Sequence, residues 1–337
     1  MADPLVVVDA DALGRNRTGD ETYVEELLRA LPRAGEGLRF AAITRRPELV
    51  PAGIEPIELA ARSQELRMAV RLPLLLQRLR PALVHFVHAL PPALPCPAVL
   101  TVQDLSFERD GSLMGHRETA IFRLVVPRSA RRAVRVLAIS ERTKDDLVEL
   151  YGLPPEKVVV TPLACDPSFT PGERSGDGGY LLLVGAIEAR KNPLAAADAA
   201  QELGLPLISV GPERDPALAT ELRRRGVDVR GFVPRTELVE LYRNAACLLF
   251  PTRYEGFGLP VAEAMASGTP VVSTPDAAVR EVGGDAVLYA QPEDFPAATR
   301  RALDERERWT QAGLARARLF SWDETARRTV AVYREAL

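Results

Sequence analysis

The chain has 337 residues, 47% of them hydrophobic, and its 43 basic and 46 acidic side chains leave a formal net charge of −3. This length exceeds what one hydrophobic core usually organises, so we expect two domains. The nearly balanced charge excludes the general attraction to nucleic acid that a strongly basic protein has. The three cysteines lie far apart and form no C-x-x-C pair, which argues against a zinc site or disulfide framework and favours a reducing cytoplasm.

The first half of the chain alternates apolar runs with helical patterns, which predicts βα units and a largely parallel sheet. Strands are expected at residues 5–10, 40–44, 82–87, 98–104, 135–140 and 157–164. The first run follows an acid instead of a basic region and is too short for a signal peptide or a membrane span. Thr18 and Glu21 have capping-box spacing before a helical pattern, which predicts a helix start there.

The composition changes abruptly after these runs. Prolines and glycines mixed with Asp, Glu and Ser predict a linker at residues 169–179. A second series of apolar runs starts at 180–186 and continues through LPLISVG, VDVRGFV, CLLFPT, TPVVST and AVLYA. We therefore expect an α/β protein with two doubly wound, Rossmann-like domains that face each other across a cleft. Ligands of such sheets bind beyond the carboxyl ends of the strands.

The segment YEGFGLPVAEAMASG, residues 254–268, has the strongest functional pattern. Glu255 lies in a glycine-rich turn, Pro260 at the predicted first helical position, and Glu263 one turn into the helix. The unpaired N–H groups and the positive dipole end of a helix that starts here predict an anion site. Two flanking carboxylates suit an anion with hydroxyl-rich groups on either side, because carboxylates accept hydrogen bonds from hydroxyls. A nucleotide diphospho-sugar has that layout.

With Glu255 and Glu263 separated by seven residues in EGFGLPVAEAMASGTPVV, the sequence resembles the retaining glycosyltransferases of family four, which have the GT-B fold. The resemblance implies that Glu263 holds the ribose hydroxyls of the donor and that Glu255 contacts the transferred sugar. It also implies that the amides of Phe257, Gly258 and Leu259 meet the phosphates. The alternative is an ordinary buried strand–helix–strand unit with solvated glutamates, which does not need an acid and a Gly-Phe-Gly turn before its helix.

The resemblance also assigns the domains. They are an acceptor-side domain at 1–168, a linker at 169–179 and a nucleotide-sugar donor-binding domain at 180–320. Ser321 and Glu324 form a capping box before a last helical pattern. Its similarity to the family's final helix implies that residues 321–337 cross back to the first domain.

A basic pair, Arg190 and Lys191, follows the predicted strand that ends at Gly185. Arginine offers a planar fork for two phosphate oxygens and lysine a compact charge, so the pair can neutralise a departing diphosphate without a metal or other cofactor. The family has a lysine at this spacing from the glycine, although a surface basic pair is the alternative. Retaining enzymes of the family use front-face return, in which a donor phosphate oxygen helps to take the acceptor proton, so no protein nucleophile is required.

In the first half, the resemblance places Gly19 in a loop against the donor phosphates or the acceptor. It places Gln103 at a strand end facing the sugar, where family members usually have a histidine. Glutamine can hydrogen-bond a sugar hydroxyl but cannot carry a proton near neutral pH. His85 and His88 lie nearby and are interpreted as core or capping histidines, with the rim of the cleft as the alternative for His88.

The resemblance further implies that Phe232 and Val233 line the base site. The predicted catalytic residues are Arg190, Lys191 and Glu255. The predicted donor-binding residues are Gly19, Gln103, Gly185, Phe232, Val233, Gly256, Phe257, Gly258, Leu259 and Glu263.

The resemblance implies a metal-independent, retaining hexosyltransferase, and the cysteine usage favours the cytoplasm. The donor would be GDP- or UDP-linked, and the RKN form of the basic loop is similar to family members that use mannose-type donors. The acceptor would be a glycan, a lipid-linked sugar or a small molecule. Two alternatives stay open, namely a non-catalytic donor-binding partner, suggested by Gln103, and a sugar-nucleotide epimerase with the same fold.

Two weaker patterns remain. Asp9 and Asp11 form a D-x-D after the first apolar run, which is typical of a metal site or of the nucleophile of a haloacid-dehalogenase-type phosphatase, but the later motifs of that phosphatase are missing. Arginine-rich amphipathic stretches at 62–80 and 117–135 indicate either solvated helix faces, which we favour, or peripheral contact with the anionic inner face of a membrane.

Overall fold

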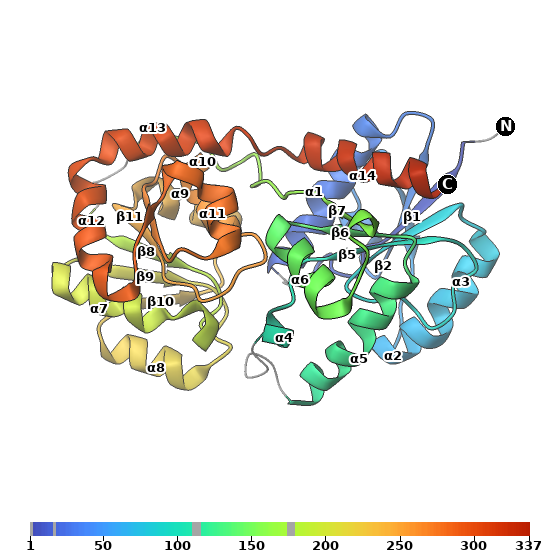
Figure 1. The fold of residues 1–337 in the computed structure, drawn as a ribbon, viewed down its shortest axis with the longest axis horizontal. Helices are drawn as coiled ribbons and strands as arrows, with labels where there is room; N and C mark the ends of the chain where they lie inside the picture. The colour runs from blue at the N-terminus through green and yellow to red at the C-terminus, as the bar shows by residue number, and fades with distance from the viewer. Residues whose placement is uncertain (1–2, 16–17, 110–115, 174–178) are drawn as a thin grey trace. The chain divides into compact units, whose positions relative to one another are not determined.

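The structure is a computed structural model that describes residues 3–15, 18–109, 116–173 and 179–337. The chain divides into two compact units (Figure 1). Unit 1 comprises Met1–Leu163 with Ser321–Leu337, and unit 2 comprises Ala164–Phe320. Each unit contains one parallel sheet with helices packed against it, which confirms the predicted α/β class with two doubly wound domains. The opposition of the two domains across a cleft stays a prediction.

The described residues of unit 1 form a seven-stranded sheet with the strand order β3-β2-β1-β4-β5-β6-β7. The strands are β1 Leu5–Asp9, β2 Arg39–Thr44, β3 Glu55–Glu58, β4 Leu83–Val87, β5 Ala98–Val102, β6 Arg135–Ala138 and β7 Val158–Val160. The helices are α1 Thr18–Ala34, α2 Gln64–Leu66, the π-helical turn η2 Arg67–Arg71, α3 Leu72–Leu79, α4 Ser106–Arg109, α5 His116–Arg132, α6 Glu141–Tyr151 and α14 Trp322–Ala336, with short 3-10 turns η1 Pro47–Leu49 and η4 Pro155–Lys157. Strand β3 is missing from the sequence prediction because its residues, EPIE, are mostly polar and exposed at the edge of the sheet.

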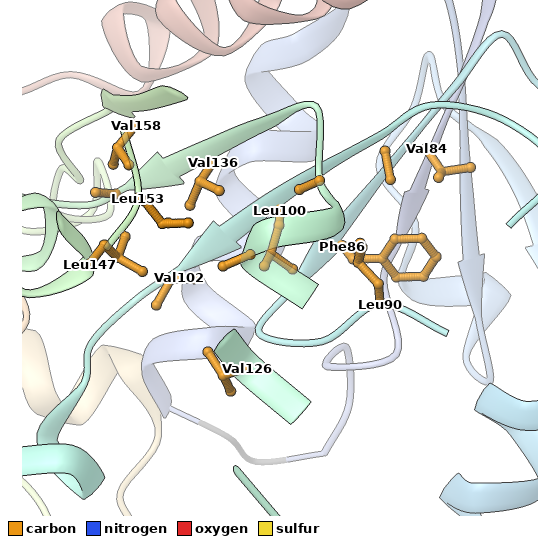
Figure 2. Close-up of a cluster of buried hydrophobic side chains, with 14 of the residues drawn as sticks. Val84, Phe86, Leu90, Leu100, Val102, Val126, Val136, Leu147, Leu153 and Val158 are labelled. Atoms are coloured by element: carbon orange, nitrogen blue, oxygen red, sulfur yellow. The ribbon is translucent and has the colours of Figure 1, made fainter. Parts of the chain in front are cut away.

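One face of this sheet is the core shown in Figure 2. Alternate residues of a strand point to the same side, so Val84 and Phe86 of β4 share this face with Leu100 and Val102 of β5. Helices α3, α5 and α6 cover it with buried side chains that include Leu72, Leu76, Val126 and Leu147. The three helices therefore lie on the same side of the sheet.

The C-terminal helix α14 belongs to unit 1 because a buried network holds it there. His85 Nδ1 lies 2.6 Å from Tyr333 Oη, and His85 Nε2 lies 2.7 Å from Thr101 Oγ1. Tyr23 Oη of α1 lies 2.8 Å from the same threonine oxygen. Burial lowers the pKa of His85 to about 3, so its imidazole is neutral. His85 is thus a core histidine, as the sequence analysis expected.

Unit 2 has six strands in its described part, in the order β10-β9-β8-β11-β12-β13. They are β8 Leu181–Val184, β9 Leu207–Val210, β10 Asp228–Gly231, β11 Cys247–Phe250, β12 Val271–Ser273 and β13 Leu288–Tyr289. The helices are α7 Pro193–Leu203, α8 Pro216–Arg224, α9 Arg235–Asn244, α10 Leu259–Ala266, α11 Ala277–Gly283, α12 Phe295–Asp304 and α13 Arg306–Ala317, with 3-10 turns η5 Ala189–Lys191, η6 Gly284–Ala286 and η7 Pro292–Asp294. Because β8 lies between β9 and β11, the loops that follow these three strands meet at one edge.

The division between the units falls at Leu163, earlier than the linker expected at 169–179. The reason is a set of contacts between the following segment and helix α9. Phe169 packs edge-on against Tyr242, with ring centroids 5.6 Å apart, and the Thr170 carbonyl accepts a hydrogen bond from Arg243 Nε at 2.8 Å. Residues 174–178 lie outside the described ranges.

Among the helices of the described ranges, none combines the length and hydropathy that a membrane crossing needs.

Candidate functional site

The basic loop after β8 and the acidic turn after β11 meet at the carboxyl edge of the unit 2 sheet. Lys191 Nζ donates a hydrogen bond to Glu255 Oε1 at 2.5 Å, although 64 residues separate them in the chain. Arg190 Nη1 lies 3.5 Å from Glu255 Oε2 and donates to the Tyr254 carbonyl at 2.7 Å. Thr252 Oγ1 donates to Glu255 Oε1 at 2.6 Å. The structure thus brings together the three residues predicted to be catalytic.

This cluster is buried and charged. Glu255 is only 6% exposed. Burial raises the pKa of a carboxyl, but the charges of Lys191 and Arg190 outweigh it and hold the pKa of Glu255 below its usual value. Arg190 is oriented from its other side by Glu188, whose Oε1 accepts from Nη2 at 2.8 Å. Lys191 Nζ also lies 5.1 Å from the centroid of the Phe250 ring, so an aromatic wall backs its ammonium group.

Helix α10 starts beside this cluster, directly after the glycine-rich turn. Gly258 precedes the helix with a φ of 102°, and as a glycine it has no side chain that could cap the helix start. Pro260 is the second helical residue, not the first as predicted, because the helix begins at Leu259. The Phe257 side chain packs inward against Phe320, with centroids 5.7 Å apart, so the backbone of Phe257 is the part that can contact a ligand. A helix start of this kind attracts anions through its N–H groups and dipole.

Glu263 has different partners from Glu255. Tyr242 Oη of α9 donates a hydrogen bond to Glu263 Oε2 at 2.8 Å. Burial raises the pKa of the Glu263 carboxyl to about 7, and the nearby negative charge of Asp166 also raises it. The hydrogen bond from Tyr242 and the charge of Arg235 lower this pKa but do not outweigh burial. The carboxyl is therefore close to half protonated at neutral pH and can both donate and accept hydrogen bonds.

We expect Glu263 to make the stability of the protein depend on pH. A carboxyl whose folded-state pKa lies above its unfolded value of about 4.5 contributes stability that is fully present below pH ~4.5 and is lost as the pH rises through about 7. Glu263→Gln keeps the acceptor for Tyr242 and removes the titration, so the free energy of unfolding of the wild type should fall relative to the variant over this range. Urea unfolding of both proteins at about pH 5 and about pH 8 measures the difference. Parallel pH profiles would contradict the assignment.

A row of glycines shapes the same edge of the sheet. Gly185, Gly211 and Gly231 lie at the ends of β8, β9 and β10, with φ values of 139°, 144° and 66°. Gly211 N donates to the Gly231 carbonyl at 2.8 Å, and a Cβ atom at Gly211 would lie 2.1 Å from the Gly185 oxygen. Only glycine permits this close backbone approach. Gly185 is among the residues predicted from the sequence, whereas Gly211 and Gly231 are not, although each lies within an apolar run that predicts a strand.

The segment after β10 contains the residues predicted for the base site. Phe232 is 63% exposed, whereas Val233 is 8% exposed. Arg235 follows at the start of α9 and forms an ion pair with Asp166. An exposed phenyl ring beside a glycine edge is available to stack on a base, and Val233 serves mainly to pack its segment.

In unit 1, Gly19 and Gln103 are neighbours. A Cβ atom at Gly19, in the first turn of α1, would lie 3.6 Å from Gln103 Oε1. Gln103 is 8% exposed, and its Nε2 has no hydrogen-bond partner within the described residues. His88 follows β4 with a φ of 66°, and its Nε2 lies 3.1 Å from Asp20 Oδ1. The capping role predicted for Thr18 involves a side chain outside the described ones, while Glu21 accepts from Gly14 N at 2.7 Å.

The D-x-D of the first strand is a structural ion cluster, which corrects the metal or phosphatase alternative. Arg67, which is fully buried, pairs with Asp9, and its Nη1 lies 3.0 Å from Asp9 Oδ2. Arg45 Nε and Arg15 Nη1 each donate to Asp11 at 2.8 Å. Guanidinium groups therefore pair with the carboxylates that would have to be free to bind a divalent cation or to act as a nucleophile.

Comparison with known proteins follows the same division of the chain. The family model described as Glycosyltransferase Family 4 matches residues 17–169, and the model described as Glycosyl transferases group 1 matches residues 178–305. D-inositol 3-phosphate glycosyltransferase 1 of Catenulispora acidiphila is 32% identical over 280 residues, which cover 72% of this chain and 67% of that protein. The chain belongs to glycosyltransferase family 4. This confirms the family resemblance noted in the sequence.

One further relative of this family 4 protein matches a smaller part of the chain, and two solved structures match nearly all of it. O-antigen chain mannosyltransferase B of Escherichia coli is 32% identical over 228 residues, 59% of this chain and 60% of its own length. Sucrose-phosphate synthase from Thermosynechococcus elongatus has a similar structure, with a TM-score of 0.76 at 17% identity over 99% of this chain and 98% of its own. Anabaena HepE in complex with UDP and glucose has a TM-score of 0.73 at 13% identity, covering 99% and 100%. These likenesses show the GT-B fold.

The roles assigned to individual residues of this family 4 chain stay predictions. The structure places Arg190, Lys191 and Glu255 in one cluster beside α10, and Glu263 in a second cluster with Tyr242. Gly19 and Gln103 form a separate group in unit 1.

Proposed function

We propose that this chain is a retaining hexosyltransferase that moves a sugar, of mannose type, from a GDP- or UDP-linked donor to an acceptor, with no metal or other cofactor. The observation that carries the proposal is the buried cluster of Arg190, Lys191 and Glu255 beside the start of α10. Two cations and a helix N-terminus suit a diphosphate, and the adjoining carboxylate suits sugar hydroxyls.

In the proposed reaction, the bond between the anomeric carbon and the donor phosphate oxygen breaks while the acceptor oxygen bonds to the same face of that carbon. The acceptor proton passes to an oxygen of the leaving diphosphate. Arg190 and Lys191 stabilise the negative charge that develops on the diphosphate, and Glu255 orients them and the sugar. Glu263 and Phe232 hold the nucleoside. Because the leaving group takes the proton, Gln103 is compatible with turnover even though it cannot carry a proton itself.

The similarity to an O-antigen chain mannosyltransferase supports the mannose-type donor. Relatives named as D-inositol 3-phosphate glycosyltransferases support a hydroxyl-rich acceptor, so a glycan, a lipid-linked sugar or a small polyol is proposed. The three cysteines are free thiols, which suits a reducing compartment, and we propose the cytoplasm for the reaction.

Release of nucleotide diphosphate from a panel of GDP- and UDP-sugars tests the proposal, with Glu255→Ala as the control. Product anomeric configuration by NMR tests retention, and unchanged rates after chelation test metal independence. Donor binding without release, with every acceptor offered, would favour the non-catalytic partner. Conversion of the donor sugar without an acceptor would favour the epimerase.

A further inference from the structure

We propose that unit 1 docks on an anionic membrane surface through the face formed by α2, η2, α3 and α5, here called the α3–α5 face. This surface is separate from the donor cluster, and binding to it requires no transferase activity. The evidence for it is that exposed apolar side chains lie beside arginines that form no ion pair with a carboxylate of the described residues.

The apolar part consists of two stripes. Leu66, Val70 and Leu74 are spaced four residues apart along α2, η2 and α3, and are 39%, 45% and 50% exposed. Four-residue spacing places side chains on one side of a helix. Ile121 and Leu124 of α5 are 49% and 53% exposed. Five large hydrophobic side chains therefore face solvent from these two segments.

Both stripes belong to one side of unit 1. Leu72 and Leu76 of α3 and Val126 of α5 are buried in the same core against the same face of the sheet. The outer sides of the two helices must therefore point away from that sheet face together. In Figure 1, α2, α3 and α5 lie on one side of the unit 1 sheet, with α1 and α14 on the other.

The charged part consists of exposed arginines on the same segments. They are Arg71, Arg78 and Arg80 beside the first stripe, and Arg128, Arg131 and Arg132 on α5. None of the six pairs with a carboxylate within the described residues. Arg71, Arg128, Arg131 and Arg132 donate to backbone carbonyls instead, which leaves their charge uncompensated.

The rest of the chain shows that this absence of ion pairs is not general. Helix α8 of unit 2 also ends in arginines, yet Arg223, Arg224 and Arg225 each pair with a carboxylate. Residues 64–80 contain one acid, Glu65, against four arginines, and residues 117–135 contain one acid, Glu118, against six arginines. The positive charge of the α3–α5 face is thus concentrated there in a protein whose net charge is −3.

Charge complementarity identifies the partner. A solvated helix face, the interpretation favoured from sequence, does not account for the apolar stripes between the arginines. An anionic bilayer binds both the apolar stripes and the arginines, because the apolar side chains enter the boundary of the acyl chains while the arginines remain among the phosphates. For a transferase with a lipid-linked acceptor, such docking would hold the enzyme at its substrate; this consequence alone rests on the proposed function.

Cosedimentation of the full chain with lipid vesicles tests the docking. We expect partition onto vesicles of phosphatidylcholine with phosphatidylglycerol to exceed that onto phosphatidylcholine alone by about tenfold, and to fall with salt. Val70→Asp with Leu74→Asp should lower this partition about tenfold. Leu319→Asp, at a 66% exposed position in unit 2, is the control for these apolar substitutions. The charge variant is Arg78→Gln with Arg128→Gln. Its control is Arg224→Gln on helix α8, where the arginine is already paired with a carboxylate.

Three results would overturn the docking proposal. They are equal partition onto neutral and anionic vesicles, unchanged partition of the Val70→Asp/Leu74→Asp variant, and a dimer in solution that this variant dissociates, which would make the face a contact between copies. Far-UV circular dichroism confirms that the variants fold. Nucleotide diphosphate release in the absence of lipid should be unchanged in the variants, so loss of docking and failure of the transferase assignment give different results.

Discussion

Lys191→Ala is expected to lower kcat for nucleotide diphosphate release by about 10²–10³-fold, with a smaller change in KM. The Lys191 ammonium is fixed against Glu255 and the Phe250 ring, so it already has its position when charge develops on the leaving diphosphate. A charge that is oriented in advance and shielded from water stabilises the transition state more than a mobile surface lysine would. Steady-state kinetics with the preferred donor measure the effect.

The same substitution leaves Glu255 without its closest cation, so stability must be measured beside activity. Removing one partner of a buried ion pair typically costs about 3–5 kcal/mol. The double variant Lys191→Ala/Glu255→Gln removes the stranded charge and should recover part of that loss in urea unfolding. It should not recover kcat. A folded Lys191→Ala enzyme with nearly wild-type kcat would refute the assigned role.

Gly211→Ala is expected to destabilise unit 2 by at least about 3 kcal/mol and to abolish donor binding. A Cβ atom would lie 2.1 Å from the Gly185 oxygen, so the loops after β8 and β9 must separate. Strain from the φ of 144° costs about 1–3 kcal/mol, and overpacking adds about 1–3 kcal/mol. The loop that moves continues into η5 and carries Arg190 and Lys191. Urea unfolding and isothermal titration with the donor measure the two effects.

Gly204→Ala is the matched control for this experiment. Gly204 also has a positive φ, 66°, but a Cβ atom there would have no neighbour within 4 Å. The control should cost only the strain of a left-handed alanine, about 1–2 kcal/mol, and leave donor affinity unchanged. Equal losses in Gly204→Ala and Gly211→Ala would mean that conformational strain alone, not the approach to Gly185, explains the effect.

Much of the local structure could be predicted from the sequence because it depends on neighbouring residues. The apolar run before Gly185 predicts β8, and the turn GFGLP predicts the start of α10 within one residue. Strand β3 could not be predicted, because a strand is identified in a sequence by the apolar residues that it buries, and this edge strand is largely exposed. Composition does not reveal that Phe169, at the start of the predicted linker, packs on Tyr242 of α9.

The candidate site could be predicted in its residues but not in its contacts. Family resemblance and local pattern identified Arg190, Lys191, Glu255 and Glu263. They did not reveal that Lys191 pairs with Glu255 while Glu263 bonds Tyr242, since these partners lie 64 and 21 residues apart. The D-x-D pattern was ambiguous for the same reason, because Arg67 reaches Asp9 only through the fold.

The sequence by itself determined the alternation of strands and helices, the α/β class and the presence of an acid–glycine–helix segment, because each depends on residues within a few positions of one another. Only the tertiary structure decided which charges are neutralised. It joined β8 to β11 so that a lysine and a glutamate became a buried pair, and within the described residues it paired none of the six arginines of the α3–α5 face with a carboxylate. Ion pairing depends on distances of a few ångströms across the fold, and no local pattern encodes those distances.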